Sequence, residues 1–104
     1  MLSARTMSLA AVCLIGGLLS GARAEPPLAD TRARLAAVVA GEHRPQADRN
    51  RDAYRRPLDT LLFFGIRDDM TVVELWPDAG WYTRMLAPFL KDNGKLYLAL
   101  GDPD

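Results

Sequence analysis

Hydrophobic and polar positions in the last third of the chain follow a strand pattern, then a helical pattern, then a strand pattern again. Residues 71–76 are β-branched and nearly continuous in apolar character, which is typical of a strand covered on both faces. Residues 81–90 carry apolar side chains at helical spacing, and residues 95–100 form a second apolar run. Turns are expected at residues 77–80 and 91–94. This order predicts one βαβ unit, which is right-handed in nearly all proteins.

The segments before the first strand predict helices instead. Residues 28–40 place apolar side chains at helical spacing, and residues 48–56 form a polar stretch of one or two helical turns. Pro57 suits the first position of a further apolar helix, which Gly65 is expected to cap. The chain is therefore expected to be an α/β domain in which N-terminal helices precede the βαβ unit.

The first 24 residues have the order of a cleavable signal peptide. Arg5 lies in a short basic start, residues 7–19 form an apolar run, and the small residues Ala22 and Ala24 precede the expected cut. The run is shorter than the roughly 20 apolar residues of a membrane-spanning helix. We expect cleavage after Ala24, a periplasmic or secreted location and no stable membrane insertion afterwards. The alternatives are a buried N-terminal helix and a lipoprotein signal.

The charge balance of the mature chain argues against nucleic acid as a partner. Removing the two arginines of the signal peptide from 13 basic residues leaves 11 against 13 acidic ones, a net charge near −2. A nucleic-acid-binding surface requires a basic excess. The arginines between Arg44 and Arg56 are interleaved with Asp48 and Asp52, which favours a solvated helix face. No metal site is expected.

The chain divides into three segments. Residues 1–24 are the signal peptide, residues 25–46 an N-terminal helix and linker, and residues 47–104 the start of a Rossmann-like domain. Parallel sheets need apolar cover on both faces, and two strands with these helices supply too little of it. We therefore expect the chain to be the N-terminal part of a longer protein, and residues 25–104 alone to be loosely packed.

The turn between the first strand and its helix points to a ligand site. Ligands of open α/β sheets bind beyond the carboxyl ends of the strands, where a helix start offers amides and a positive dipole end. Glu74 lies near the end of the strand and Gly80 at the start of the helix. An acidic strand-end residue can hold an ammonium or a hydroxyl group. The turn therefore predicts a site for a nucleotide-like cofactor.

These residues resemble the first motif of class I S-adenosylmethionine-dependent methyltransferases, an acid followed by glycines at alternate positions. Glu74 matches the acid and Gly80 the third glycine, whereas Trp76 and Asp78 stand at the first two glycine positions. The general motif is therefore half met.

The wider string is similar to a narrower family of exported proteins predicted to be such methyltransferases. Its members pair Trp-Pro before a glycine-rich turn with Trp-Tyr-Thr after it, here at residues 76–77 and 81–83. They also share an upstream run like residues 49–65, and the resemblance covers about residues 41–104. It implies a Rossmann-like methyltransferase fold, S-adenosylmethionine as cofactor and a small-molecule acceptor.

The resemblance implies a set of cofactor-binding residues and leaves the catalytic ones unknown. The candidates are Glu74, Trp76, Pro77, Asp78, Ala79, Gly80 and Asp102. Asp78 would repel the methionyl carboxylate of the cofactor, unless it turns to solvent or binds the amino group. Leu100 stands where this fold commonly has an acid for the ribose hydroxyls, and Asp102 is a substitute. Catalytic groups would come from later strand ends.

Two other functions compete with methyl transfer. The first is a non-catalytic exported domain that kept the fold and lost the cofactor, because S-adenosylmethionine is made in the cytosol. The second is a nicotinamide-dependent oxidoreductase, for which Gly80 alone poorly replaces the two or three glycines that a pyrophosphate needs.

Several candidate residues also have a plainer structural role. Glu74 could pair with an arginine, and Trp81 and Tyr82 could pack in the core or at the helix start. Tyr54 and Arg55 could cover the mouth of the site or dock their own helix.

Overall fold

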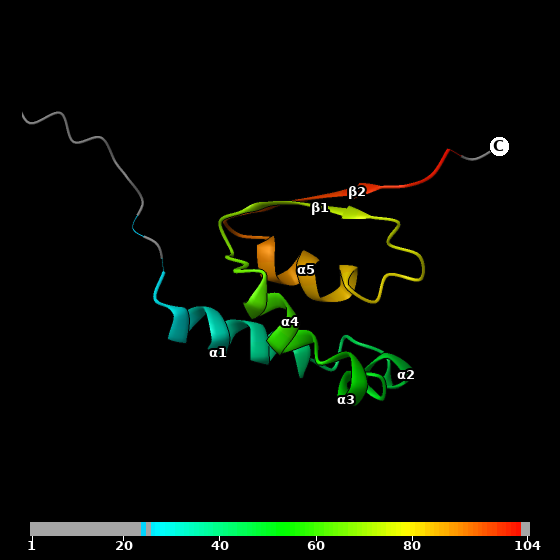
Figure 1. Ribbon diagram of the computed structural model, residues 1–104, viewed down its shortest axis with the longest axis horizontal. Helices are drawn as coiled ribbons and strands as arrows, with labels where there is room; N and C mark the ends of the chain where they lie inside the picture. Colours follow the sequence, from blue (N-terminus) through cyan, green and yellow to red (C-terminus); the bar gives the residue numbers. More distant parts are fainter. Residues whose placement is uncertain (1–23, 25, 103–104) are drawn as a thin grey trace, which may run out of the picture.

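The computed structural model describes residue 24 and residues 26–102. The expected signal peptide, residues 1–24, lies outside the described residues except for Ala24. In chain order the elements are α1 (Leu28–Val39), α2 (Gln46–Arg49), α3 (Asp52–Arg55), α4 (Pro57–Phe63), β1 (Thr71–Leu75), α5 (Thr83–Leu90) and β2 (Lys95–Ala99) (Figure 1). Among the described residues, no helix is long and apolar enough to cross a membrane.

The sheet has two parallel strands joined through α5. Thr71 of β1 lies opposite Lys95 of β2, and Leu75 lies opposite Ala99. The predicted strand–helix–strand order is confirmed, and the described chain is a small α/β domain.

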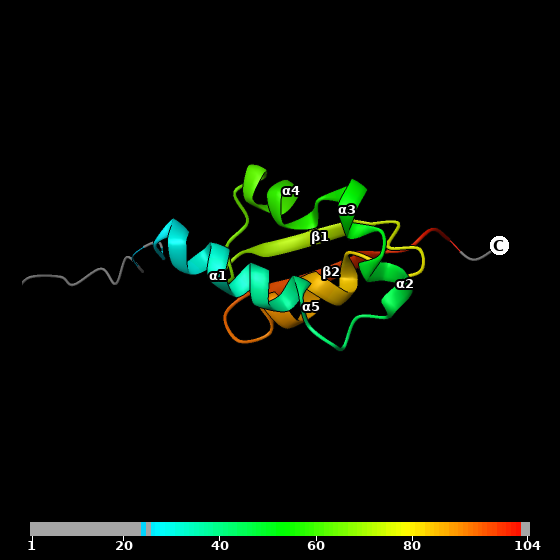
Figure 2. The ribbon, with the colours of Figure 1, turned by 90° about the horizontal axis from the view of Figure 1, so that it is seen from below.

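The described helices lie on one face of the sheet. Figures 1 and 2 show α5 directly against the strands, with α1 and α4 forming the layer below it. Val72 of β1 and Leu96 of β2 point toward these helices and pack against the core. The buried core residues come from α1, from α4 and the turn after it, and from α5: Leu35, Leu61, Ile66, Leu86, Phe89 and Leu90.

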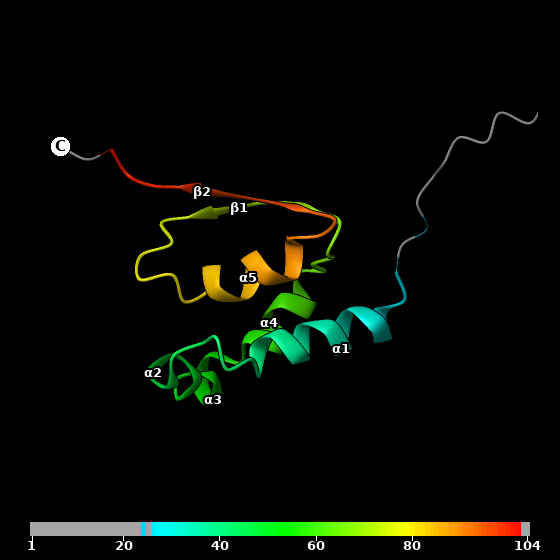
Figure 3. The ribbon, with the colours of Figure 1, turned by 180° about the vertical axis from the view of Figure 1, so that it is seen from behind.

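The opposite face of the sheet is exposed. Val73 is 56% exposed, Leu75 66% and Tyr97 55%, and Figure 3 shows no helix over this face. Successive strand residues alternate between the two faces, so these side chains point away from α5. Within the described residues the sheet is covered on one face, which agrees with the expectation that these helices supply too little apolar cover for both faces.

The ends of α4 follow from its sequence. Pro57 occupies the first helical position, where its missing N–H removes no hydrogen bond. Gly65 has a φ of 68°, and the N–H of Ile66 donates to the carbonyl of Leu61 at 3.2 Å. This left-handed cap, which glycine adopts without a steric penalty, turns the chain toward β1 as predicted.

Arg44 corrects the prediction that the arginines of this region form a solvated face. The Arg44 side chain is fully buried and donates to both carboxylate oxygens of Asp52, each at 2.7 Å. It also donates to the carbonyl of Val39 at 2.6 Å. The hydrogen bond to Asp52 raises the pKa of Arg44 above its ordinary value, against the effect of burial. Arg44 therefore ties the end of α1 to α3.

Asp68 joins three parts of the chain and makes stability depend on pH. Its buried carboxylate accepts hydrogen bonds from Asn93 at 2.8 Å and from Arg34 of α1. The hydrogen bond from Asn93, together with Arg34, holds the pKa of Asp68 below its ordinary value. A carboxyl whose pKa is lowered by folding stabilises the fold above its unfolded pKa of about 3.9, and this contribution disappears as pH falls through the folded pKa.

We therefore expect Asp68→Asn to lower the free energy of unfolding at pH 7 by roughly 1–3 kcal/mol, because a charged hydrogen-bond acceptor is lost. The difference between variant and parent should shrink as the pH falls below about 4. Thermal unfolding of the full-length protein at pH 7, 4 and 3 measures this. A difference that stays constant over this range would contradict the assignment.

Candidate functional site

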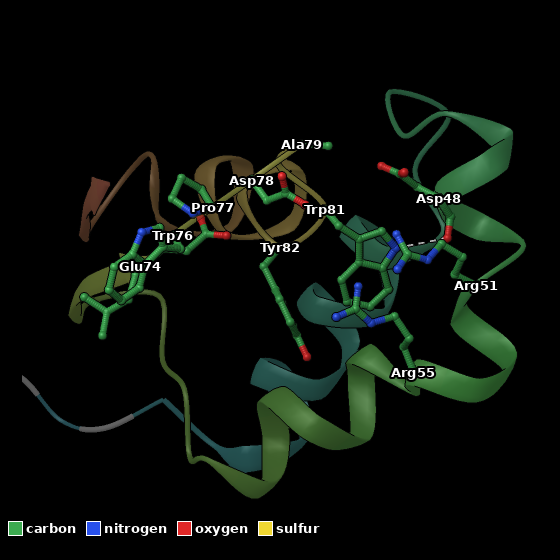
Figure 4. A pocket seen from close by; sticks show the side chains of 11 residues that line it. Asp48, Arg51, Arg55, Glu74, Trp76, Pro77, Asp78, Ala79, Trp81 and Tyr82 are labelled. Atoms are coloured by element: carbon green, nitrogen blue, oxygen red, sulfur yellow. Dashed lines mark hydrogen bonds between the residues drawn. The ribbon is translucent and has the colours of Figure 1, made fainter. Parts of the chain in front are cut away.

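A pocket opens at the carboxyl end of β1, between the turn to α5 and the α2–α3 segment. Its volume is about 340 Å³ (Figure 4). The residues that line it are Asp48, Arg51, Arg55, Glu74, Leu75, Trp76, Pro77, Asp78, Ala79, Trp81 and Tyr82. This is the edge of a parallel sheet at which ligands of open α/β folds bind.

The turn after β1 has a left-handed backbone at alternate positions. The φ angles are 47° at Trp76, 51° at Asp78 and 81° at Gly80. The N–H of Gly80 donates to the carbonyl of Pro77 at 2.8 Å and closes the turn. A left-handed residue other than glycine costs roughly 1–2 kcal/mol, less for aspartate than for a bulky side chain. The turn thus has the backbone that glycines at all three positions would adopt without strain.

Glu74 is held by the first turn of α5. Its Oε2 accepts a hydrogen bond from the Oγ1 of Thr83 at 2.7 Å. Within the described residues no arginine pairs with Glu74. Its second carboxylate oxygen accepts no hydrogen bond within the described residues and stays available to a ligand.

Trp81 combines a packing role with a place in the pocket wall. It is 5% exposed, and its indole N–H donates to the carbonyl of Asp48 at 3.1 Å. Its ring meets Tyr82 edge to face, with centroids 4.7 Å apart. The contact with Asp48 attaches the α2–α3 segment to the start of α5.

The α2–α3 segment contributes two arginines to the pocket. The guanidinium of Arg55 lies over the ring of Trp81, 4.3 Å from its centroid, and Arg51 lines the same wall (Figure 4). Tyr54, by contrast, is 81% exposed and lies outside the lining. The Asp48 carboxylate accepts a hydrogen bond from Arg84 of α5 at 2.7 Å.

Asp48 and Arg51 line the pocket but were not predicted from the sequence as site residues. A polar stretch that precedes the sheet by twenty residues carries no pattern that assigns it to a pocket. The one usable signal is the spacing of Arg51 and Arg55, because residues four apart share a helix face.

Five of the seven candidate cofactor-binding residues line the pocket, and two do not. The five are Glu74, Trp76, Pro77, Asp78 and Ala79. Gly80 lies in the same turn, outside the lining. Asp102 follows β2, is exposed and does not line the pocket, and Leu100 is 74% exposed.

The pocket is lined by ionisable side chains from two parts of the chain. It offers carboxylates on the strand and turn, and guanidinium groups on the opposite segment, so both signs of charge are present. In the described residues, no group of three or more His, Cys, Asp or Glu side chains could hold a metal ion. His43 is exposed, lies outside the lining, and its Nε2 contacts the carbonyl of Arg84 at 2.9 Å.

No family model matches this chain, and comparisons with curated proteins and with solved structures found no match either.

Proposed function

We propose that the pocket binds S-adenosylmethionine and that the protein transfers its methyl group to a small-molecule acceptor. The observation that carries this proposal is the left-handed backbone at Trp76, Asp78 and Gly80, directly after Glu74. The methyltransferase motif is an acid followed by three glycines at alternate positions, and the sequence matches it only in part. The backbone of the turn matches it more fully, because all three alternate positions after Glu74 have the left-handed conformation that glycine favours. The proposal includes a Rossmann-like methyltransferase fold and, from the first 24 residues, a periplasmic or secreted location.

In this proposal the chain binds and orients its ligands. The methyl group is already activated on the sulfonium of S-adenosylmethionine, so the protein chiefly positions the acceptor. Glu74, fixed by Thr83, would hold the ammonium group of the cofactor through water. The amides near Gly80 would face its carboxylate, because a helix start favours negative charge.

A second candidate is an exported domain that has this fold and no longer binds the cofactor. Leu100 is exposed at the end of β2, where the fold commonly has an acid, and Asp102 does not line the pocket. A nicotinamide-dependent oxidoreductase is a weaker candidate, because Gly80 is the one glycine of the turn.

Removing the charge of Asp78 should strengthen cofactor binding. A screened charge contact is worth on the order of 1 kcal/mol, close to a tenfold change in affinity. In the full-length protein we expect Asp78→Gly to bind S-adenosylhomocysteine several-fold more tightly than the parent, and Glu74→Ala to bind it more weakly. Isothermal titration calorimetry measures both.

Asp78→Asn separates the effect of the charge from that of the backbone conformation, because asparagine also tolerates φ near 51°. It should tighten binding nearly as much as Asp78→Gly. Asp92→Gly, in the exposed turn before β2, removes an equal charge outside the pocket and should leave the affinity for S-adenosylhomocysteine unchanged. Weaker binding in both Asp78 variants would show that this carboxylate attracts the ligand.

A further inference from the structure

Two arginines of the pocket have hydrogen-bonding capacity that the described chain does not use. The side chains of Arg51 and Arg55 form no hydrogen bond and no ion pair within the described residues. Nearby arginines are engaged: Arg44 with Asp52, and Arg84 with Asp48. The donors of Arg51 and Arg55 are therefore free to bind a ligand.

The fold presents both groups to the same space. Arg51 and Arg55 are four residues apart at the start and end of α3, a spacing that places side chains on one helix face. The stacking of Arg55 on Trp81 orients its guanidinium plane and leaves the N–H groups at its edge open. Figure 4 shows both arginines on the α2–α3 side of the pocket.

The acidic groups of the pocket do not neutralise these arginines. Asp48 is bound by Arg84 at 2.7 Å, and Glu74 accepts from Thr83 at 2.7 Å. Asp78 has no side-chain partner in the described residues. The hydrogen bond from the neutral Thr83 hydroxyl leaves the charge of Glu74 in place, so Glu74 and Asp78 make the β1–turn side of the pocket acidic. Arg51 and Arg55 make the α2–α3 side basic, and an anionic group is attracted to that side.

We propose that Arg51 and Arg55 form a clamp for a carboxylate group. A guanidinium presents paired N–H donors that match the two oxygens of a carboxylate, and two guanidiniums also offset the negative charge of Asp78. Two ligands could supply this carboxylate. One is the cofactor, through its methionyl carboxylate, and this source rests on the proposed function. The other is the methyl acceptor, and this source would identify the acceptor as a carboxylic acid.

The test uses the full-length protein, its Arg51→Met variant and three probes. S-adenosylhomocysteine carries the methionyl carboxylate, 5′-methylthioadenosine lacks it, and succinate supplies carboxylates alone. The nucleosides are titrated by calorimetry. Succinate is titrated with and without S-adenosylhomocysteine while the indole N–H signals of Trp76 and Trp81 are followed by nuclear magnetic resonance. Arg56→Met is the control, because Arg56 pairs with Asp59 outside the pocket.

If the clamp holds the cofactor, Arg51→Met weakens S-adenosylhomocysteine binding about tenfold and leaves 5′-methylthioadenosine within twofold. If it holds the acceptor, both nucleosides bind unchanged, and the succinate-induced shift of the Trp81 indole signal, seen in the parent, is lost. Succinate binding that Arg51→Met abolishes, in a parent that binds neither nucleoside, would support the clamp while the proposed function fails. Equal affinities of parent and variant for all three probes would overturn the clamp.

Discussion

Arg44→Met is expected to lower the free energy of unfolding by about 3 kcal/mol, the lower end of the cost of breaking a buried ion pair, because Asp52 keeps 22% of its side chain exposed. The Arg44 side chain is fully buried, so its loss leaves the Asp52 carboxylate without its two 2.7 Å hydrogen bonds and the carbonyl of Val39 without its donor. Its guanidinium also lies 5.5 Å from the centroid of the Trp81 ring. The substitution should therefore loosen the α2–α3 segment that forms one wall of the pocket.

Thermal unfolding of the full-length protein, followed by circular dichroism, measures this effect. Arg56→Met is the matched control, because Arg56 forms an exposed ion pair with Asp59 and such pairs contribute about 0–1 kcal/mol. Replacing both partners, as Arg44→Met with Asp52→Leu, should recover part of the loss, since no buried charge then remains alone. Equal effects of Arg44→Met and Arg56→Met would refute a structural role for the buried pair.

Gly94→Ala is expected to destabilise the fold by roughly 1–3 kcal/mol or more, because an added methyl group has no room. A Cβ at this position would lie 2.6 Å from the carbonyl oxygens of Asp68 and Met70, and 2.9 Å from a methyl carbon of Leu90. Two of these three atoms belong to the backbone and cannot rotate away. Gly94 lets the turn before β2 lie close to the turn before β1. At this contact the N–H of Lys95 donates to the carbonyl of Met70.

Gly101→Ala is the control for this prediction. Its Cβ would lie 3.3 Å from the indole nitrogen of Trp76, an exposed side chain that can move, so the expected change is small. Limited proteolysis of the full-length protein at equal protease concentration compares the two variants. Cleavage of Gly94→Ala at the rate of the parent would contradict the steric argument.

The order of elements could be predicted from the sequence because local patterns determine it. β-branched residues mark β1, and Pro57 and Gly65 bound α4. The start of α5 was predicted two residues too early, at residue 81 instead of Thr83. The N–H of Arg84 already donates to the carbonyl of Gly80 at 3.0 Å, so the helical hydrogen bonds begin at the end of the turn and the two-residue difference lies in how the first turn of α5 is assigned.

Long-range contacts could not be predicted in the same way. The burial of Arg44 depends on Asp52, and the position of Asp48 depends on the indole of Trp81 and on Arg84. Within a polar stretch of sequence, a residue that is exposed to solvent cannot be distinguished from one that binds a partner in a distant element. Glu74 and the turn after it could be predicted as a candidate site because all of their residues lie in one short segment of the sequence.

Calorimetric titration of the full-length protein with S-adenosylhomocysteine tests the central claim most directly. We expect saturable binding at one site, weakened by Glu74→Ala and strengthened by Asp78→Gly, with no binding of NAD under the same conditions. Absence of detectable S-adenosylhomocysteine binding in both the parent and Asp78→Gly would contradict the methyltransferase proposal and favour the domain that no longer binds the cofactor.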